Sequence, residues 1–191
     1  MTTKAMASLI ALAFATAGTA HAGAGDPMAS FGSPGWSFTE YTTSTAGGAP
    51  VGNGLVDVNK TLYFVDEKAV NGVKSWYVFF DPLCRSVVDA EITFSSVITG
   101  IVTDSKGLLL SDPVYGIGDL TYLNNRYTGL ERGDFARQTG GSTLSIHWQA
   151  SDPGDHVRIY TAVPEPQTYA LLLSGLAMLA LATRRRKVRT C

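Results

Sequence analysis

The sequence contains little cysteine. Only Cys84 and Cys191 occur among 191 residues, and Cys191 is the last of them. Small domains held together by disulfides need several paired cysteines, so that class of protein is excluded. A single cysteine inside a domain usually packs as a small apolar side chain, and we expect Cys84 to be buried in this way.

Local signatures of catalysis and cofactor binding are also lacking. The sequence has no HExxH, no CxxC, no glycine-rich phosphate loop after a strand and no Gly-x-Ser-x-Gly elbow. We therefore predict that the protein is not an enzyme, and we assign it no catalytic residue, metal ligand or cofactor. Asp152–His156 offers oxygen and imidazole ligands, but its central Pro-Gly is typical of a turn. Arg132-Gly-Asp134 matches an adhesion tripeptide and likewise indicates a turn.

Positive charge is scarce in the central part of the chain. From Gly23 to Val163 there are nine Lys and Arg against fifteen Asp and Glu, a net charge of −6, although the whole chain has a net charge of −1. Proteins that bind nucleic acids neutralise phosphates with clustered basic side chains. The acidic central part therefore argues against a nucleic-acid partner.

Residues 1–22 have the layout of a secretory signal peptide. Lys4 precedes an apolar run from Ala5 to Ala17, and the small residues Ala20 and Ala22 mark a cleavage site. The run of about 13 residues is too short to cross a bilayer core of ~30 Å. We therefore predict a signal-peptide helix that is removed on export by a cut after Ala22.

Residues 163–191 combine an apolar segment with a basic end. Eighteen residues between Glu165 and Arg184 carry no charge, which corresponds to about 27 Å of helix. We predict a transmembrane helix at about 167–183, just long enough to cross a slightly thinned bilayer. The basic residues that follow this helix form a membrane stop signal: Arg184, Arg185, Arg186 and Lys187. The positive-inside rule places them on the cytoplasmic side.

Three ordered parts of this segment carry a resemblance. Pro164-Glu165-Pro166, the apolar stretch Leu171–Leu181 and the arginines at 184–186 closely resemble the PEP-CTERM sorting signal of Gram-negative bacteria. The resemblance implies that exosortase, a membrane-embedded transpeptidase-like enzyme, is the processing partner and cuts near the Pro-Glu-Pro. It also implies a transient anchor in the inner membrane, then a place at the cell surface or in the extracellular matrix, and an association with exopolysaccharide and biofilm formation.

Residues 23–162 form the predicted exported body between the two signals. Short β-branched and aromatic runs alternate with turn signals such as Asn71-Gly72 and Asp112-Pro113. This pattern predicts an all-β body, an antiparallel β-sandwich or jelly roll, with no helix outside the two ends of the chain. Strands are expected at Leu55–Val58, Thr61–Val65, Val73–Phe80, Ala90–Thr103, Thr143–Gln149 and Val157–Tyr160.

Aromatic side chains are candidates for stacking on sugars, although most aromatic residues of β-proteins fill the core. The candidates are Trp76, Tyr77, Tyr115, Tyr122, Tyr127 and Trp148. His147 alternates with apolar neighbours and is expected on the exposed face of its strand.

We predict a structural or binding role in the exopolysaccharide matrix. Two alternatives stay open. An extracellular polysaccharide hydrolase or lyase would need two carboxylates about 5–10 Å apart in a cleft. A permanently anchored single-span envelope protein would keep its C-terminal helix and the basic end beyond it.

Overall fold

The computed structural model describes residues 25–45, 50–51, 54–123, 126–163 and 175–176. The predicted cleavage residues Ala20 and Ala22 lie outside these ranges, as does the Pro-Glu-Pro at 164–166. The same holds for the predicted transmembrane helix at 167–183, apart from Gly175 and Leu176, and for the basic residues 184–187. Across the ranges that are described, no helix is both long and apolar enough to cross a membrane.

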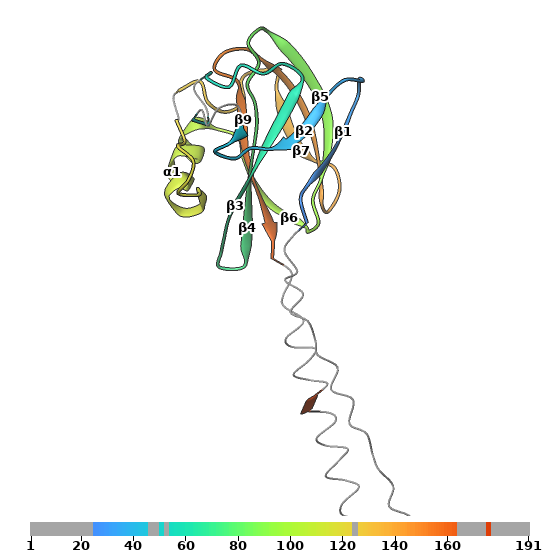
Figure 1. Cartoon of the computed structure of the whole chain (residues 1–191). Helices are drawn as coiled ribbons and strands as arrows, with labels where there is room; N and C mark the ends of the chain where they lie inside the picture. The colour runs from blue at the N-terminus through green and yellow to red at the C-terminus, as the bar shows by residue number, and fades with distance from the viewer. Residues whose placement is uncertain (1–24, 46–49, 52–53, 124–125, 164–174, 177–191) are drawn as a thin grey trace, which may run out of the picture.

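Two β-sheets pack face to face (Figure 1), as the alternating sequence pattern predicts. The four-stranded sheet has the order β1 (Met28–Phe31), β5 (Ser86–Thr93), β8 (Thr143–Ala150) and β7 (Phe135–Gln138). The five-stranded sheet has the order β2 (Ser37–Glu40), β3 (Thr61–Val70), β4 (Val73–Phe80), β9 (Asp155–Ala162) and β6 (Ile98–Val102). One pair, β2 with β3, is parallel, so the prediction of a purely antiparallel sandwich is wrong in this detail.

The main core lies between the two sheets. In β5 the buried Val88, Ala90 and Ile92 alternate with the exposed Asp89 and Glu91, because successive side chains of a strand point to opposite faces. Their partners across the core come from the five-stranded sheet and include Phe64, Trp76, Val78, Phe80, Val157 and Ile159. This apolar layer fixes which side chains of the four-stranded sheet face solvent.

A helix covers the outer face of the five-stranded sheet, which the sequence pattern did not predict. Helix α1 spans Ser105–Tyr115 and is capped by Asp104, whose carboxylate accepts a hydrogen bond from the Gly107 amide. Asp112-Pro113, which predicted a turn, lies inside its last turns. Proline and glycine are poor helix formers in isolation. Tertiary packing therefore determines that this segment is helical.

The second core beneath α1 explains this packing. Leu108 is fully buried and packs with Tyr63, Val65, Tyr77 and Phe79, which project from the outer face of β3 and β4. Strand β4 is therefore buried on both faces from Ser75 to Phe80. The energy gained by burying these apolar side chains outweighs the weak helix propensity of the segment.

The strand predictions differ in accuracy. β4 matches its predicted range, and Asn71-Gly72, with φ of 51° and 78°, forms the predicted hairpin turn. Ala90–Thr103 divides into β5 and β6, whereas Leu55–Val58 forms no strand because its amides turn toward Asp81. The prediction missed β1, β2 and β7, each of four residues, which are too short to show a periodic pattern.

Candidate functional site

A groove of about 330 Å³ crosses the outer face of the four-stranded sheet. Its polar lining follows from the strand register. Ser30 of β1 lies opposite Glu91 of β5, which lies opposite Ser145 of β8. Ser145 in turn pairs with Arg137 of β7, so one row of polar side chains runs across all four strands. Regular strands therefore hold these groups at fixed spacing.

A second row runs beside the first. Asp89 pairs with His147, and His147 pairs with Phe135, another residue of the groove. The Asp89 Oδ1 and His147 Nδ1 atoms are 2.6 Å apart, within hydrogen-bonding distance. The rings of His147 and Phe135 stack at 5.7 Å between centroids, and the Arg137 guanidinium lies 4.6 Å from the Phe135 ring centroid. The prediction that His147 faces outward is confirmed.

Asp89 and Glu91 give the groove its chemical character. They are two residues apart on one strand, so their Cα atoms are about 6.6 Å apart on the same face. Both are exposed. Ionised carboxylates only accept hydrogen bonds, so the groove presents acceptors to a ligand that carries hydroxyl or amino donors. The two carboxylates disfavour a polyanion because like charges repel, whereas Arg137, at the β7 end of the row, carries the opposite charge.

Most aromatic candidates belong to the core and not to the groove. Trp76, Tyr77 and Trp148 are almost completely buried, which confirms the core interpretation for these three. Tyr122 is half-buried against Tyr77. Tyr127 is exposed beside the Arg126 guanidinium.

The half-buried Tyr115 packs on the ring of Tyr160, at the end of α1. The groove residues Asp89, Glu91 and Phe135 were not singled out from the sequence. The alternation of acidic and apolar residues over 87–92 was the available signal, but it does not distinguish a binding face from an ordinary solvated face.

A second polar cluster is enclosed beneath α1. The Arg158 guanidinium donates to both oxygens of Glu67 at 2.7 Å, and to the Asp112 carboxylate at 2.8 Å. It also donates to the Leu108 carbonyl at 3.0 Å and to the Ser111 hydroxyl. Arg158 and Glu67 side chains are fully buried.

This cluster connects α1 to the sheet. Glu67 and Arg158 come from β3 and β9, whereas the other partners of Arg158 lie on α1. The guanidinium also lies 4.9 Å from the Tyr77 ring centroid, a cation–π contact. Because the side chains of Arg158 and Glu67 are closed to solvent, the cluster positions the helix and offers little surface to a ligand.

The segment Asp152–His156 forms the predicted turn into β9. Gly154 has a φ of 82°, a backbone conformation that favours glycine, and its amide bonds to the Ser151 carbonyl. The side chains of the next two residues, Asp155 and His156, are buried on opposite faces of the sheet. Across the described ranges, no group of three or more His, Cys, Asp or Glu side chains is placed to hold a metal ion.

Burial changes the protonation of both side chains. Desolvation, with the nearby charges of Asp134 and Glu131, raises the pKa of Asp155 to about 8. Desolvation lowers the pKa of His156 to about 4, and its ring stacks on Phe79. At neutral pH both side chains are therefore mainly uncharged, as expected for buried groups that form no ion pair within the described part of the chain.

Two further expectations concern surface residues. Cys84 is exposed, so the expectation of a buried cysteine is wrong. It lies in the short loop between β4 and β5, where Asp81 and Pro82 are buried and the next three residues, Leu83, Cys84 and Arg85, face solvent. Arg132-Gly-Asp134 forms the predicted turn, with Gly133 at a φ of 114° and the Asp134 amide bonded to the Glu131 carbonyl.

The described part of the sandwich ends directly after β9. Ala162, the last residue of β9, pairs with Val73 of β4, and its amide donates to the Val97 carbonyl at 2.9 Å. The Val163 amide donates to the Gly72 carbonyl at 2.9 Å. The folded body therefore extends to the residue before the Pro-Glu-Pro at 164–166.

Comparison with known proteins assigns this end of the chain. Residues 162–187 match the family model of the PEP-CTERM protein-sorting motif, so the resemblance seen in the sequence is confirmed. No curated protein and no solved structure matches the chain. The motif indicates an exported, surface-sorted protein of Gram-negative bacteria that is targeted to exosortase. The chain therefore carries a PEP-CTERM protein-sorting motif at residues 162–187.

Proposed function

We propose that this protein is a non-enzymatic component of the extracellular polysaccharide matrix and that it binds a saccharide in the groove of its four-stranded sheet. The sorting motif at residues 162–187 supports delivery to the cell exterior. The observation that carries the binding role is the pair of exposed carboxylates, Asp89 and Glu91, in a groove built on regular strands. A shallow groove of this kind can contact an extended polymer, which does not have to enter a deep pocket.

The chemistry of the groove favours a neutral or amino-bearing saccharide. Sugar hydroxyls donate to carboxylates, and hydrogen bonds to charged groups contribute about 1.5–3 kcal/mol each. Uronic-acid polymers carry the same charge as Asp89 and Glu91, and the central part of the chain has a net charge of −6. Repulsion between like charges therefore supports selection against acidic polysaccharides.

Export and processing belong to the same proposal. We propose that residues 1–22 are removed on export and that exosortase cuts near Pro164–Pro166, after a transient anchor in the inner membrane. Mass spectrometry of the protein recovered from the cell surface or medium tests both cuts. A recovered chain that retains Arg184–Lys187 would instead indicate a permanently anchored envelope protein.

Affinity electrophoresis of the full-length protein in mild detergent tests saccharide binding. The gels contain the extracellular polysaccharide of the producing cells, a neutral glucan or an alginate. We expect retardation by one of the first two and none by alginate. Replacing both groove acids, Asp89→Ala with Glu91→Ala, should weaken retardation at least about tenfold, the effect of losing one or more charged hydrogen bonds.

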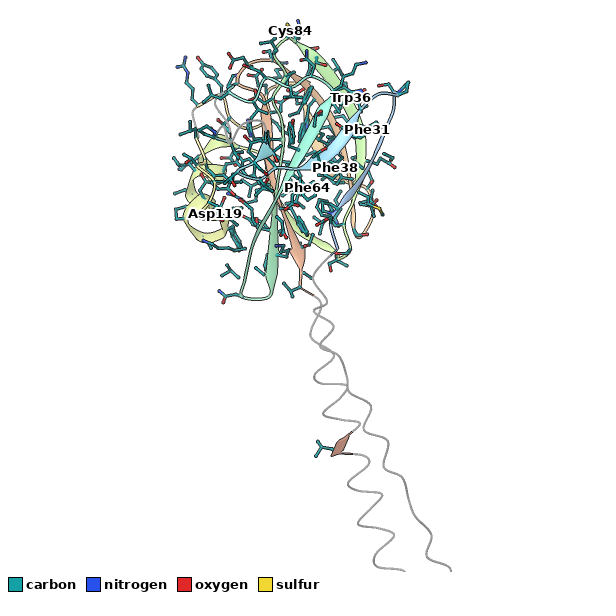
Figure 2. All side chains as sticks on the ribbon, viewed as in Figure 1. Phe31, Trp36, Phe38, Phe64, Cys84 and Asp119 are labelled. Carbon is teal, nitrogen blue, oxygen red and sulfur yellow. The ribbon has the colours of Figure 1, made fainter. Side chains whose placement is uncertain are left out.

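Asp119→Ala is the matched control for this experiment. Asp119 is an exposed carboxylate beside α1, and Figure 2 shows it on the side of the molecule away from Phe31 of the groove. The control should bind like the wild type. Equal retardation of the wild type and the double variant would contradict the proposed site.

The second candidate function is cleavage of a polysaccharide, either by hydrolysis or by the elimination reaction of a lyase. It is favoured by the same pair, since two neighbouring carboxylates in a groove are what glycoside hydrolysis requires. Assays for new reducing ends and for unsaturated ends on the same polysaccharides separate the two functions. Turnover that disappears in Glu91→Gln, while retardation in the gel persists, would replace the binding role by a catalytic one.

A further inference from the structure

The sorting motif begins inside the folded body. Its first matched residue, Ala162, is also the last residue of β9. Backbone hydrogen bonds at 2.9 Å join Ala162 to Val97, and Val163 to Gly72. An enzyme that reads the whole motif therefore meets residues that are still part of the sandwich.

These residues lie in the middle of a continuous surface, which we name the exit face. It comprises the three turns at 69–73, 94–99 and 139–142, together with Ala162 and Val163. The Ile98 amide donates to the Gly141 carbonyl at 2.8 Å, and the Phe94 amide to the Ser142 carbonyl at 2.9 Å, so the second and third turns are joined. The bonds of Ala162 and Val163 join the second turn to the first.

The position of the exit face follows from the strand register. Val73 pairs with Ala162 at one end of β4 and β9, whereas Phe80 pairs with Asp155 at the other end. Figure 1 shows the β3–β4 turn and the end of β9 together at one end of the sandwich. Figure 2 shows Cys84 at the opposite end.

The turns of the exit face contain no charged residue. Charged side chains stand at its edge: Lys68 and Lys74 flank the first turn, and Asp26 lies two residues before Met28, which pairs with Thr93 beside the second turn. Positions 69–73, 94–99, 139–142 and 162–163 consist only of Ala, Val, Ile, Phe, Gly, Ser, Thr and Asn. The opposite end is acidic, because the charges of Asp57 and Asp152 act on Asp81, and those of Glu131 and Asp134 act on Asp155. An uncharged surface loses little hydration energy when another protein covers it, whereas charged side chains would have to be desolvated.

We infer that the exit face is a docking surface for the processing enzyme, so that exosortase acts on the motif while it contacts these turns. The inference rests on the proposed processing by exosortase. Only residues 164–166 separate the sandwich from the predicted apolar segment, and three extended residues span about 10 Å. The chain therefore provides no spacer that would keep the enzyme away from the body.

Charge placed on the exit face tests the contact. The exit-face variant is the full-length chain with three substitutions at exposed turn positions: Ser95→Asp, Val97→Asp and Thr139→Asp. The control carries Leu83→Asp, Cys84→Asp and Ser151→Asp, which are exposed at the opposite end. The fraction of precursor converted to the mature form is followed by immunoblot in cells that contain the sorting enzyme. We expect conversion to be about tenfold slower in the exit-face variant and unchanged in the control.

A spacer distinguishes lost contact from misfolding. Eight Gly and Ser residues inserted between Val163 and Pro164 add up to about 26 Å of chain and move the charged turns away from the enzyme. Conversion of the exit-face variant should then recover to within about twofold of the wild type. The inference is overturned if the spacer does not restore conversion of the exit-face variant. It is also overturned if the exit-face variant without a spacer is converted as fast as the wild type.

A lysine series separates the enzyme from the lipid bilayer. Lys at positions 95, 97 and 139 should slow conversion as much as Asp does if the exit face packs against a protein. If Lys is tolerated and only Asp slows conversion, the face contacts an anionic membrane surface, and enzyme docking is overturned. Absence of conversion in the wild type would instead refute the proposed sorting, which is a separate outcome.

Discussion

At the scale of single residues, the body encloses several ionisable side chains in different ways. Arg158 is buried but fully paired with Glu67 and Asp112, whereas Asp155 and His156 are buried and form no ion pair with any residue that the structure describes. A buried charge is tolerated only when hydrogen bonds and an opposite charge replace water. The two kinds of site therefore respond to mutation and to pH in different ways.

Removal of one partner from the buried cluster should be costly. In Arg158→Met, the Glu67 carboxylate remains buried without its counter-charge, and we expect the free energy of unfolding to fall by about 3–5 kcal/mol. Arg137→Met, at an exposed arginine, should change it by less than about 0.5 kcal/mol. Urea unfolding measures both. Equal effects of the two substitutions would contradict the role of the cluster.

Asp155 should make stability depend on pH. Its pKa rises from an ordinary 3.8 to about 8 in the folded protein, so between these values the unfolded chain has lost a proton that the folded protein keeps. The free energy of unfolding from this group therefore falls as pH rises from about 4 to about 8. Asp155→Asn should be as stable as the wild type near pH 4 and more stable at pH 9.

The contribution of other groups cancels in this comparison. The raised pKa of Asp81, about 6, and the lowered pKa of His156, about 4, are present in both proteins. Urea unfolding of the two proteins across this pH range gives the difference directly. A difference that stays constant from pH 4 to pH 9 would show that Asp155 ionises normally in the folded state.

At the scale of elements, the sequence predicted the features that depend on local periodicity. The alternation in Thr143–Gln149 and the turn Asn71-Gly72 were sufficient for β8 and for the β3–β4 hairpin. Helix α1 could not be predicted, because Gly107 and Pro113 oppose a helix locally, whereas the burial of Leu108 and the bonds to Arg158 that favour it depend on the distant sheet. The groove was missed for a related reason, since it needs residues from four strands.

Packing of α1 on the sheet can be tested with two neighbouring leucines. Leu108 is fully buried, whereas Leu109 is 56% exposed. Leu108→Ala should lower the free energy of unfolding by about 2–5 kcal/mol through lost burial and the cavity that remains. Leu109→Ala should change it by less than about 0.5 kcal/mol. Urea unfolding should separate the two variants clearly, and similar losses would mean that α1 is not docked as described.

At the scale of the whole molecule, the two ends of the sandwich differ in charge. The uncharged exit face surrounds the point where the chain continues into the sorting motif, and acidic side chains gather at the other end. The groove lies on the outer face of one sheet, between these ends. This arrangement leaves the groove accessible while the exit face is covered.

The stability of the body should depend on β9 and not on the residues beyond Val163. β9 lies between β4 and β6 and carries Val157, Arg158 and Ile159, which are fully buried. A chain that stops after Val163 keeps every strand and every hydrogen bond of β9, so its urea midpoint in the same detergent should equal that of the intact chain. A chain that stops after Ser151 loses β9, an interior strand of the five-stranded sheet, and should show no cooperative unfolding. A lowered midpoint after the first truncation would mean that later residues pack on the sandwich, and processing near Pro164–Pro166 would then destabilise the protein that it releases.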